Sequence, residues 1–279
     1  MFVRGGRHSD RLMGIVAPQA HHPGEGRRQT VIEHSDPIKL HPEGVDLRKE
    51  QEATLSRPRM TYTFMARFFF AFMDFVYGKK LTVPKIKLIE ILARIPYHAW
   101  EIKAYWRLTF GYADEKIRRE GQELVKLGRL SQDNEYWHLI IAVEKIKEDD
   151  IKQSGFWYTF MPKLFALSYS VFARTLATIS LKQSFYFNAM FEDHAEHEYA
   201  NFVKNHPELD SQPIKSELVK QFGGYDNWGD VFRKIGLDER AHKNNSLREC
   251  GRGAEQYTYV SISQEENDRF LHSNVLTRG

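Results

Sequence analysis

Apolar residues recur every three to four positions along most of this 279-residue chain, and this is the spacing of one face of an α-helix. The pattern predicts helices over about 83–110, 115–147, 174–205 and 230–248, with a loop near residues 128–133 inside the second. Alternation typical of a strand is confined to residues 256–262. We therefore predict an all-α fold, built as a helical bundle.

The two ends of the chain differ in composition from its centre. Residues 1–58 are rich in Arg, His, Gly and Pro, and such a stretch buries too little apolar surface to offset the entropy of ordering it. We expect a flexible arm over 1–58, one folded domain over 59–252 and a tail over 253–279. Whether the arm is a targeting segment stays open at this point.

Charge and cysteine content exclude several classes of protein. The net charge of +3 is too small for a dedicated nucleic-acid binder, which needs a concentrated basic face. The single cysteine, Cys250, rules out an internal disulfide and a zinc site built from several thiolates.

Two aromatic segments, 65–77 and 156–187, come close to membrane character without a charge-free run long enough to span a bilayer. Their dispersed basic residues fit helices that lie in the membrane interface. Core helices of a soluble bundle would show the same pattern, so both interpretations stay open from the residues alone.

Two Glu-x-x-His pairs suggest a metal site: Glu135 with His138, and Glu239 with His242. Residues three apart share one face of a helix, so each pair can offer a carboxylate and an imidazole to one point. Ferritin-like di-iron proteins combine two such pairs with one Glu from each of two further helices. Carboxylate and imidazole together suit iron.

Two lone glutamates complete that order along the chain. Glu90 stands among Leu and Ile residues, and Glu192 follows an apolar run over 185–191. Burying such a carboxylate is costly unless it is paired or bound to a metal. Because chance supplies short motifs of this kind, the residues alone also allow surface carboxylates that merely cap or pair.

Neighbouring polar residues have more than one interpretation. We expect His194 to support the site from behind its ligands and His197 to face solvent. Tyr199, two turns from Glu192, is either a core tyrosine or a group that hydrogen-bonds the site and donates an electron to it. Asn134 and Asp238 each precede a candidate ligand, and both fit ordinary helix-surface positions equally well.

Four segments, in the same order, resemble the alternative oxidases, especially their plastid terminal oxidase branch. The Leu-Ile-Glu-Ile-Leu-Ala-Arg-Ile-Pro-Tyr run over 88–97 resembles the segment of the first iron ligand. The Asn-Glu-x-x-His-Leu run over 134–139, the Glu-Asp-His-Ala run in 191–199 and the Asp-Glu-x-x-His run over 238–242 resemble the other three. The resemblance covers about residues 70–250.

The resemblance implies a ferritin-like di-iron four-helix bundle with additional interfacial helices, lying in one membrane leaflet and forming a homodimer. Tyr199 would correspond to the tyrosine near the metals. Two iron ions would be held by six residues: Glu90, Glu135, His138, Glu192, Glu239 and His242.

The implied activity is that of a quinol oxidase, which oxidises ubiquinol or plastoquinol and reduces O2 to water without pumping protons. Quinol would approach near Lys85, Ile89, Phe191 and Ala195, and Lys85 stands where mitochondrial members have an arginine. The membrane would be a thylakoid or the mitochondrial inner membrane in a eukaryote, and the plasma membrane or a thylakoid in a bacterium.

Two other functions stay open. A di-iron hydroxylase of a quinone precursor would use the same ligands, and a metal-free relative could serve a structural role in a membrane complex. The stretch between Glu90 and Glu135 is longer than is usual in the family, and we expect the additional residues to lie in a loop.

Overall fold

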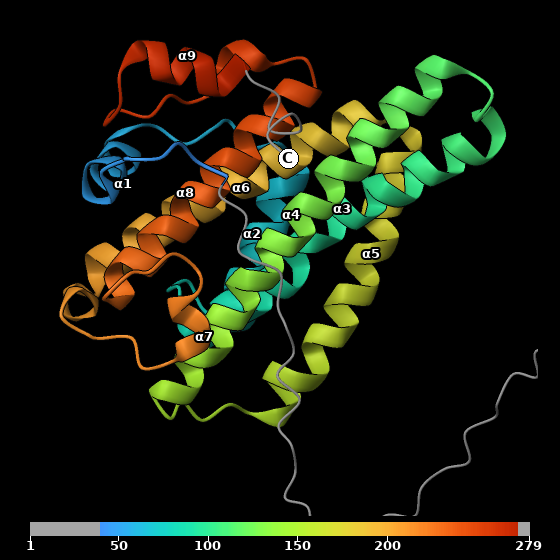
Figure 1. Ribbon diagram of the computed structural model, residues 1–279. Coiled ribbons are helices and arrows are strands. Elements are labelled where there is room, and N and C mark those ends of the chain that lie inside the picture. Colours follow the sequence, from blue (N-terminus) through green and yellow to red (C-terminus); the bar gives the residue numbers. More distant parts are fainter. Residues whose placement is uncertain (1–39, 273–279) are drawn as a thin grey trace, which may run out of the picture. The chain divides into compact units, whose positions relative to one another are not determined.

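The computed structural model describes residues 40–272, and within them it contains helices, one isolated bridge between Pro213 and Asn227 and no strand (Figure 1). The all-α prediction is confirmed for this part of the chain. The α-helices are α1 (Leu47–Ser56), α2 (Phe64–Tyr77), α3 (Val83–Gly111), α4 (Glu115–Glu148), α5 (Met161–Ile179), α6 (Leu181–Asn205), α7 (Glu217–Lys220), α8 (Trp228–Glu249) and α9 (Gln264–His272). A π-helical turn, η1 (Phe156–Phe160), and two 3-10 turns, η2 (Pro207–Asp210) and η3 (Gly253–Glu255), connect them.

Four long helices form the centre of the fold. Helix α3 packs along α4, and α6 packs along α8, and the four lie side by side (Figure 1). The predicted helices over 83–110, 115–147 and 230–248 agree with α3, α4 and α8 within one or two residues. The helix predicted over 174–205 is divided at Ser180, whose backbone is extended and whose side chain caps α6 by accepting a bond from the amide of Gln183.

The loop predicted near residues 128–133 is wrong, because α4 continues through it without a break. Gly128 serves packing instead of a turn. A Cβ atom at this position would lie 3.0 Å from the carbonyl oxygen of Tyr97 on α3. The glycine therefore permits the backbones of α3 and α4 to approach closely beside the site described below.

The stretch between Glu90 and Glu135, where a loop was expected, is almost entirely helical. Helices α3 and α4 have 29 and 34 residues, and they are joined by residues 112–114 alone. Asp114 begins α4 by accepting hydrogen bonds from the amides of Lys116 and Ile117. The two helices therefore form a long helical hairpin with a short connection, because a side-chain cap can start α4 directly after the turn.

Part of the expected flexible arm is folded. Residues 47–56 form α1, which begins at the capping residue Asp46 and packs on α6 and α8 (Figure 1). Its inward side chains, Glu50 and Thr54, are polar yet buried, and an apolar-periodicity argument does not detect such a face. Residues 1–39, with the targeting question, lie outside the described residues.

The segment over 256–262 forms no strand. Side-chain amides satisfy its backbone instead: Asn244 binds both polar groups offered by Tyr257, and Asn267 does the same for Tyr259. The expected tail over 253–279 thus includes an ordered portion, in which Tyr259 is buried and α9 packs nearby.

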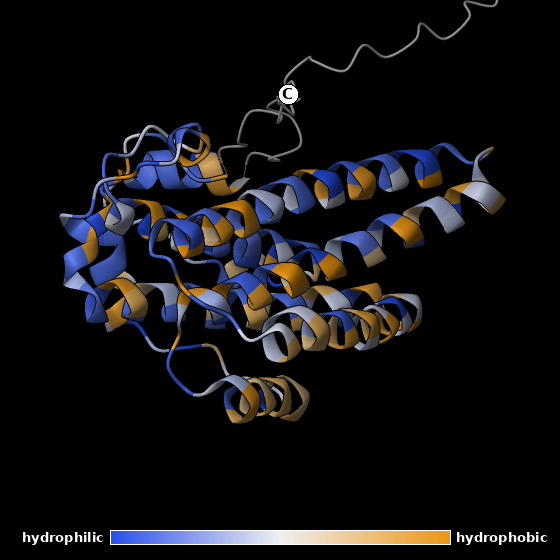
Figure 2. Cartoon of the chain, turned by 90° about the horizontal axis from the view of Figure 1, so that it is seen from below, coloured by the Kyte–Doolittle hydropathy of each residue, from blue (hydrophilic) through white to orange (hydrophobic). Residues whose placement is uncertain are grey.

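Helix α2 and the region of η1 and α5 expose many large apolar side chains. Helix α2 is hydrophobic almost throughout (Figure 2), and Phe64 and Phe75 are 81% and 87% exposed. Other exposed members are Phe68, Phe72, Phe156, Trp157, Phe160, Leu164, Leu167 and Val171. Among residues 40–272, no helix has both the length and the apolar character needed to cross a bilayer.

Candidate metal centre

Four acidic or imidazole side chains meet at the centre of the long helices. Glu90 of α3, Glu135 and His138 of α4, and Glu239 of α8 each place one potential ligand atom within 4.8 Å of the others. All four side chains are essentially inaccessible to solvent. This buried cluster could hold a metal ion, as the spacing of the motifs predicted.

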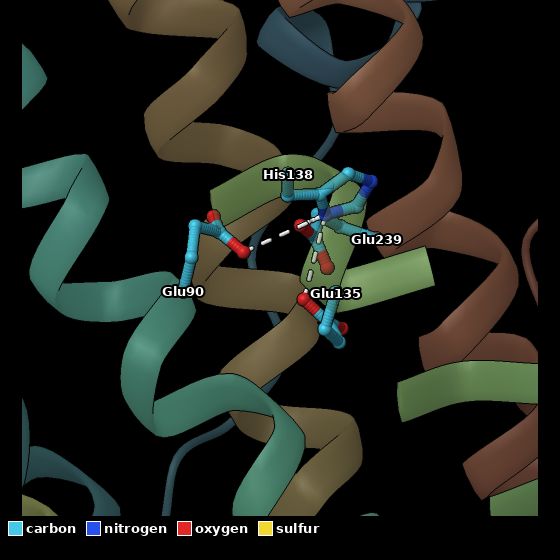
Figure 3. A group of neighbouring side chains, drawn as sticks. All are labelled: Glu90, Glu135, His138 and Glu239. Atoms are coloured by element: carbon cyan, nitrogen blue, oxygen red, sulfur yellow. Dashed lines mark ion pairs between the residues drawn. The ribbon is translucent and has the colours of Figure 1, made fainter. Parts of the chain in front are cut away.

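His138 occupies the middle of the cluster (Figure 3). Its Nδ1 atom lies 3.5 Å from Glu90 Oε2, 3.4 Å from Glu135 Oε2 and 3.2 Å from Glu239 Oε1. Because the three carboxylates come from three helices, no single element could produce this convergence.

The other two predicted ligands adjoin the same cluster. His242 places Nε2 3.3 Å from Glu135 Oε1, and Glu192 of α6 lines the same pocket as Glu90 and Glu239. Both side chains are buried. The structure therefore brings all six residues named from the sequence to one site.

Asn134 and Asp238 are buried groups that orient the histidines, and the surface interpretation is wrong for both. His138 Nε2 lies 3.1 Å from Asp238 Oδ2, and His242 Nε2 lies 2.9 Å from Asn134 Oδ1. Asn134 also donates to Asp238, over 3.2 Å. Each motif thus holds the histidine of the other, as the partners of metal-bound histidines commonly do.

The carboxylates carry a strong electrostatic penalty. Burial raises the pKa of Glu135 and Glu192 well above the ordinary value, and repulsion from Glu239 raises both further. Burial raises the pKa of Glu239 as well, although its contact with His138 opposes this. Several negative charges packed together need either protons or a cation.

The pKa values of the two histidines are shifted in opposite directions. Burial alone would lower the pKa of His138, but Asp238 and the three surrounding glutamates raise it well above its usual value. Burial and the neighbouring His138 lower the pKa of His242 to about 3. His242 is therefore neutral at physiological pH, which is the state in which imidazole binds metals.

Within the described part of the chain, several polar atoms of the cluster are buried without a hydrogen bond. They are Glu90 Oε2, both oxygens of Glu135, His138 Nδ1, Glu239 Oε2 and His242 Nδ1. Leaving so many buried polar atoms unsatisfied is expensive. They are also the donor atoms that a metal would use, so the site fits a bound metal better than a purely structural cluster.

Two tyrosines donate to carboxylates of the site. Tyr199 donates its hydroxyl to Glu90, as its candidate role required. Tyr97, which we did not single out from the sequence, donates to Glu192 Oε1 over 2.6 Å. A repeated spacing could have revealed it, because Glu90 precedes Tyr97 by seven residues and Glu192 precedes Tyr199 by seven.

An apolar pocket leads to the carboxylates. The four predicted quinol contacts, Lys85, Ile89, Phe191 and Ala195, all line it, and so do Glu90, Glu192 and Glu239. A second pocket between α2 and α5 shares Met73, Leu92, Tyr169 and Phe191 with the first. The two pockets are therefore adjacent, and the outer one is lined by the exposed rings of Phe68 and Phe72.

At the pocket, Lys85 is held by Asp74 and by the carbonyl of Gly78, each 2.7 Å from its ammonium nitrogen. His194 also lines the pocket, stacks on Phe70 at 3.9 Å between ring centroids and contacts Arg59.

The solvent-facing role expected for His197 is wrong. Its ring is buried, with Nδ1 2.8 Å from the carbonyl oxygen of Asp193. The side chain lies against the chain segment around Arg57 instead of in water.

Comparisons of the chain with protein-family models, with curated proteins and with solved structures found no match.

Proposed function

We propose that this protein is a quinol oxidase of the alternative oxidase type, a ferritin-like four-helix bundle that holds two irons and associates with one membrane leaflet. The observation that carries the proposal is a pair of adjacent pockets, one lined by the buried carboxylates and the other by exposed aromatic rings. A substrate dissolved in lipid could reach the metals by this route without crossing water. The homodimer implied by the resemblance belongs to the same proposal.

Charge supports a centre with two metals. The four glutamates together carry about four negative charges when ionised, which two ferrous ions would balance. Nε2 of His138 contacts Asp238, and Nε2 of His242 contacts Asn134. The other ring nitrogen of each histidine is therefore available to bind one metal. Glu90, Glu135, Glu192 and Glu239 would supply the remaining ligands.

The exposed aromatic surface supports association with a membrane. Contiguous apolar surface of this kind usually marks an interaction site. The surface carries basic side chains nearby, such as Lys163 and Arg174 on α5, which suits a helix lying among lipid headgroups. We propose that α2 and α5 enter the leaflet and that quinol enters between them.

Two irons held by these residues would supply the redox chemistry that couples oxidation of two quinols to reduction of one O2, giving two quinones and two waters. The protein's own residues exclude water by burial and keep the histidines oriented through Asn134 and Asp238. Tyr199 holds its proton at a carboxylate oxygen of Glu90, where its hydroxyl could give up that proton together with an electron. Lys85 lines the pocket, and its ammonium group lies close to where a quinol oxygen would lie.

Oxygen uptake by membranes that contain the protein tests this function. Uptake should be insensitive to cyanide and should require a quinol, with ubiquinol and plastoquinol analogues offered in turn. Glu192→Ala and His242→Ala should abolish it, whereas Glu123→Ala, at an exposed position of α4, should retain it. Uptake that survives both ligand substitutions would contradict the assigned site.

Two further measurements separate the alternatives. With labelled O2, an oxidase leaves the label in water alone, whereas a hydroxylase places it in the ring of the product. Purified, folded protein should contain about two irons per chain. Less than about one would favour a structural, metal-free role.

A further inference from the structure

The two halves of the site repeat the same Glu–Tyr spacing. Glu90 and Tyr97 lie on α3, and Glu192 and Tyr199 lie on α6. Seven residues make almost two turns of an α-helix, so the members of each pair share a face and lie about 10 Å apart along the axis.

The tyrosine of each pair donates to the glutamate of the other pair. Tyr199 of α6 donates to Glu90 of α3, and Tyr97 of α3 donates to Glu192 of α6. This exchange requires α3 and α6 to run antiparallel at the site. Helices α4 and α8 show the same relation, because Asn134 meets His242 while Asp238 meets His138. The polar contacts are therefore related by an approximate twofold axis.

We propose that Tyr97 is the twofold counterpart of Tyr199: a positioning residue that orients Glu192 as a ligand of one metal, while Tyr199 orients Glu90 at the other. The proposal rests on the two-metal centre proposed above. It assigns a distinct metal position to each tyrosine.

The surroundings of Tyr97 support an orienting role. Its side chain is buried, and its ring packs 4.9 Å from Trp100 and 5.2 Å from His242 between centroids. The hydroxyl therefore has little freedom to turn away from Glu192. The hydrogen bond also acts on a defined atom, Oε1, and so fixes the rotation of the carboxylate.

A glycine of a neighbouring helix lies beside each tyrosine, tightly against the backbone of Tyr97 and at ordinary van der Waals distance from Tyr199. A Cβ atom at Gly128 of α4 would lie 3.0 Å from the Tyr97 carbonyl oxygen, and one at Gly236 of α8 would lie 3.4 Å from Tyr199 Cβ. Both tyrosine-bearing turns are thus packed closely against the helix that carries a Glu-x-x-His pair.

The two halves differ in one supporting contact. Asn188, four residues before Glu192, donates to the same Oε1 atom over 2.9 Å and to Tyr97 over 3.1 Å. The corresponding position before Glu90 is Ile86, which is apolar. Glu192 therefore keeps one donor when the Tyr97 hydroxyl is removed, whereas Glu90 loses the only side-chain donor described for Oε1.

Titration of the full-length, metal-free protein with Co2+, followed by its visible absorption, tests the assignment without relying on activity. Wild-type protein should bind two equivalents. Tyr199→Phe should weaken one of them by about 10–100-fold, as the loss of an outer-shell partner does. Tyr97→Phe should weaken the other by roughly tenfold, and adding Asn188→Ala should enlarge this loss towards that of Tyr199→Phe. The double variant Tyr97→Phe/Tyr199→Phe should weaken both equivalents.

Tyr259→Phe is the matched control, because it removes a buried hydroxyl that forms no hydrogen bond among residues 40–272 and keeps the ring that packs against Phe270. It should leave both Co2+ equivalents and their absorption unchanged. The assignment is overturned if Tyr97→Phe/Asn188→Ala binds like wild type, or if Tyr97→Phe and Tyr199→Phe weaken the same equivalent. Wild-type protein that binds only one Co2+ would instead overturn the two-metal function together with the twofold assignment.

Discussion

Two buried charged regions share residues of the same pair of helices, α6 and α8. They differ in whether nearby cations balance their carboxylates. The candidate metal cluster, by which we mean the six candidate ligands together, contains Glu192 and Glu239. The second region contains Glu196, one turn after Glu192, and Arg240, the residue after Glu239. We call the second region the ionic cluster; it comprises Glu50, Arg57, Asp193, Glu196, Arg240 and Lys243.

The ionic cluster balances its charges. Glu196 contacts Arg57, Arg240 and Lys243 and also accepts a hydrogen bond from Thr54. Burial alone would raise the pKa of Glu196, but the three cations hold it well below the ordinary value. The pKa of Glu192, one turn away, is raised instead.

The contrast shows what marks a metal site among buried acids. Both regions are inaccessible to solvent, so burial does not distinguish them. Among residues 40–272, the carboxylates of the candidate metal cluster form no ion pair with Arg or Lys, and several of its donor atoms have no hydrogen bond. The ionic cluster, by contrast, supplies a cation for each acid. An uncompensated set of buried carboxylates is the arrangement that a bound cation completes.

The largest expected effect comes from neutralising an acid of the candidate metal cluster. Glu135→Gln should reduce quinol-dependent oxygen uptake by more than about a hundredfold, since direct ligands matter more than the outer-shell groups that cost 10–100-fold. The metal-free variant should fold at least as stably as wild type, because one buried negative charge is gone. Oxygen uptake and thermal denaturation in a chelator measure the two outcomes, and a strongly destabilised metal-free variant would contradict the comparison.

Neutralising Glu196 of the ionic cluster should instead lower the stability of the fold and leave metal binding intact. Glu196→Gln removes one ion-pair partner from each of Arg57, Arg240 and Lys243. Breaking a buried ion pair costs about 3–5 kcal/mol. Denaturant unfolding measures this loss. The fraction that stays folded should still bind metal in the wild-type ratio; loss of metal without loss of stability would assign Glu196 to the metal site.

The two regions should also respond oppositely to pH in metal-free protein. Glu135, Glu192 and Glu239 have raised pKa values, so the stability linked to them is present below the unfolded value of about 4.3 and is lost as pH rises through their folded values. Glu196 has a lowered pKa, so its contribution is present above about 4.3 and is lost as pH falls.

Thermal denaturation in a chelator, across a pH series, separates these contributions. Glu192→Gln should remove part of the loss at rising pH, on the order of 1 kcal/mol, and Glu196→Gln should remove part of the loss in acid. Addition of Co2+ should restore stability most at high pH, because the metal displaces protons from its ligands. Identical pH profiles of stability for Glu192→Gln and Glu196→Gln would contradict this difference between the two regions.

The smallest effect is expected at the boundary of the candidate metal cluster. Lys234 forms an ion pair with Asp238, which in turn orients His138. Lys234→Met should weaken one Co2+ equivalent by about tenfold or less, because the change acts through two intervening residues. Lys147→Met, which removes a surface ion pair with Glu144, is the control and should leave Co2+ binding unchanged.

Local patterns in the sequence predicted most of the long helices, and the six candidate ligands followed from those patterns together with the resemblance of the motifs. Periodicity of 3.6 residues survives in any environment that buries one face, which is why α3, α4 and α8 agree with prediction within a residue or two. Gly128 misled the prediction, because its role is a close approach to Tyr97 from another helix. A glycine that serves packing looks the same in the sequence as one that serves a turn.

The sequence alone determined that two Glu-x-x-His pairs and two lone glutamates lie on helices, because the spacing of residues on one helix is a local property. Only the tertiary structure decided which acids lack a cation. Glu192 and Glu196 are one turn apart on α6, yet Glu196 meets Arg57 and Arg240 from distant segments while Glu192 meets Glu239 and Tyr97. Those partners come from α3, α8 and the segment after α1, and the field they create exists only after the helices have packed.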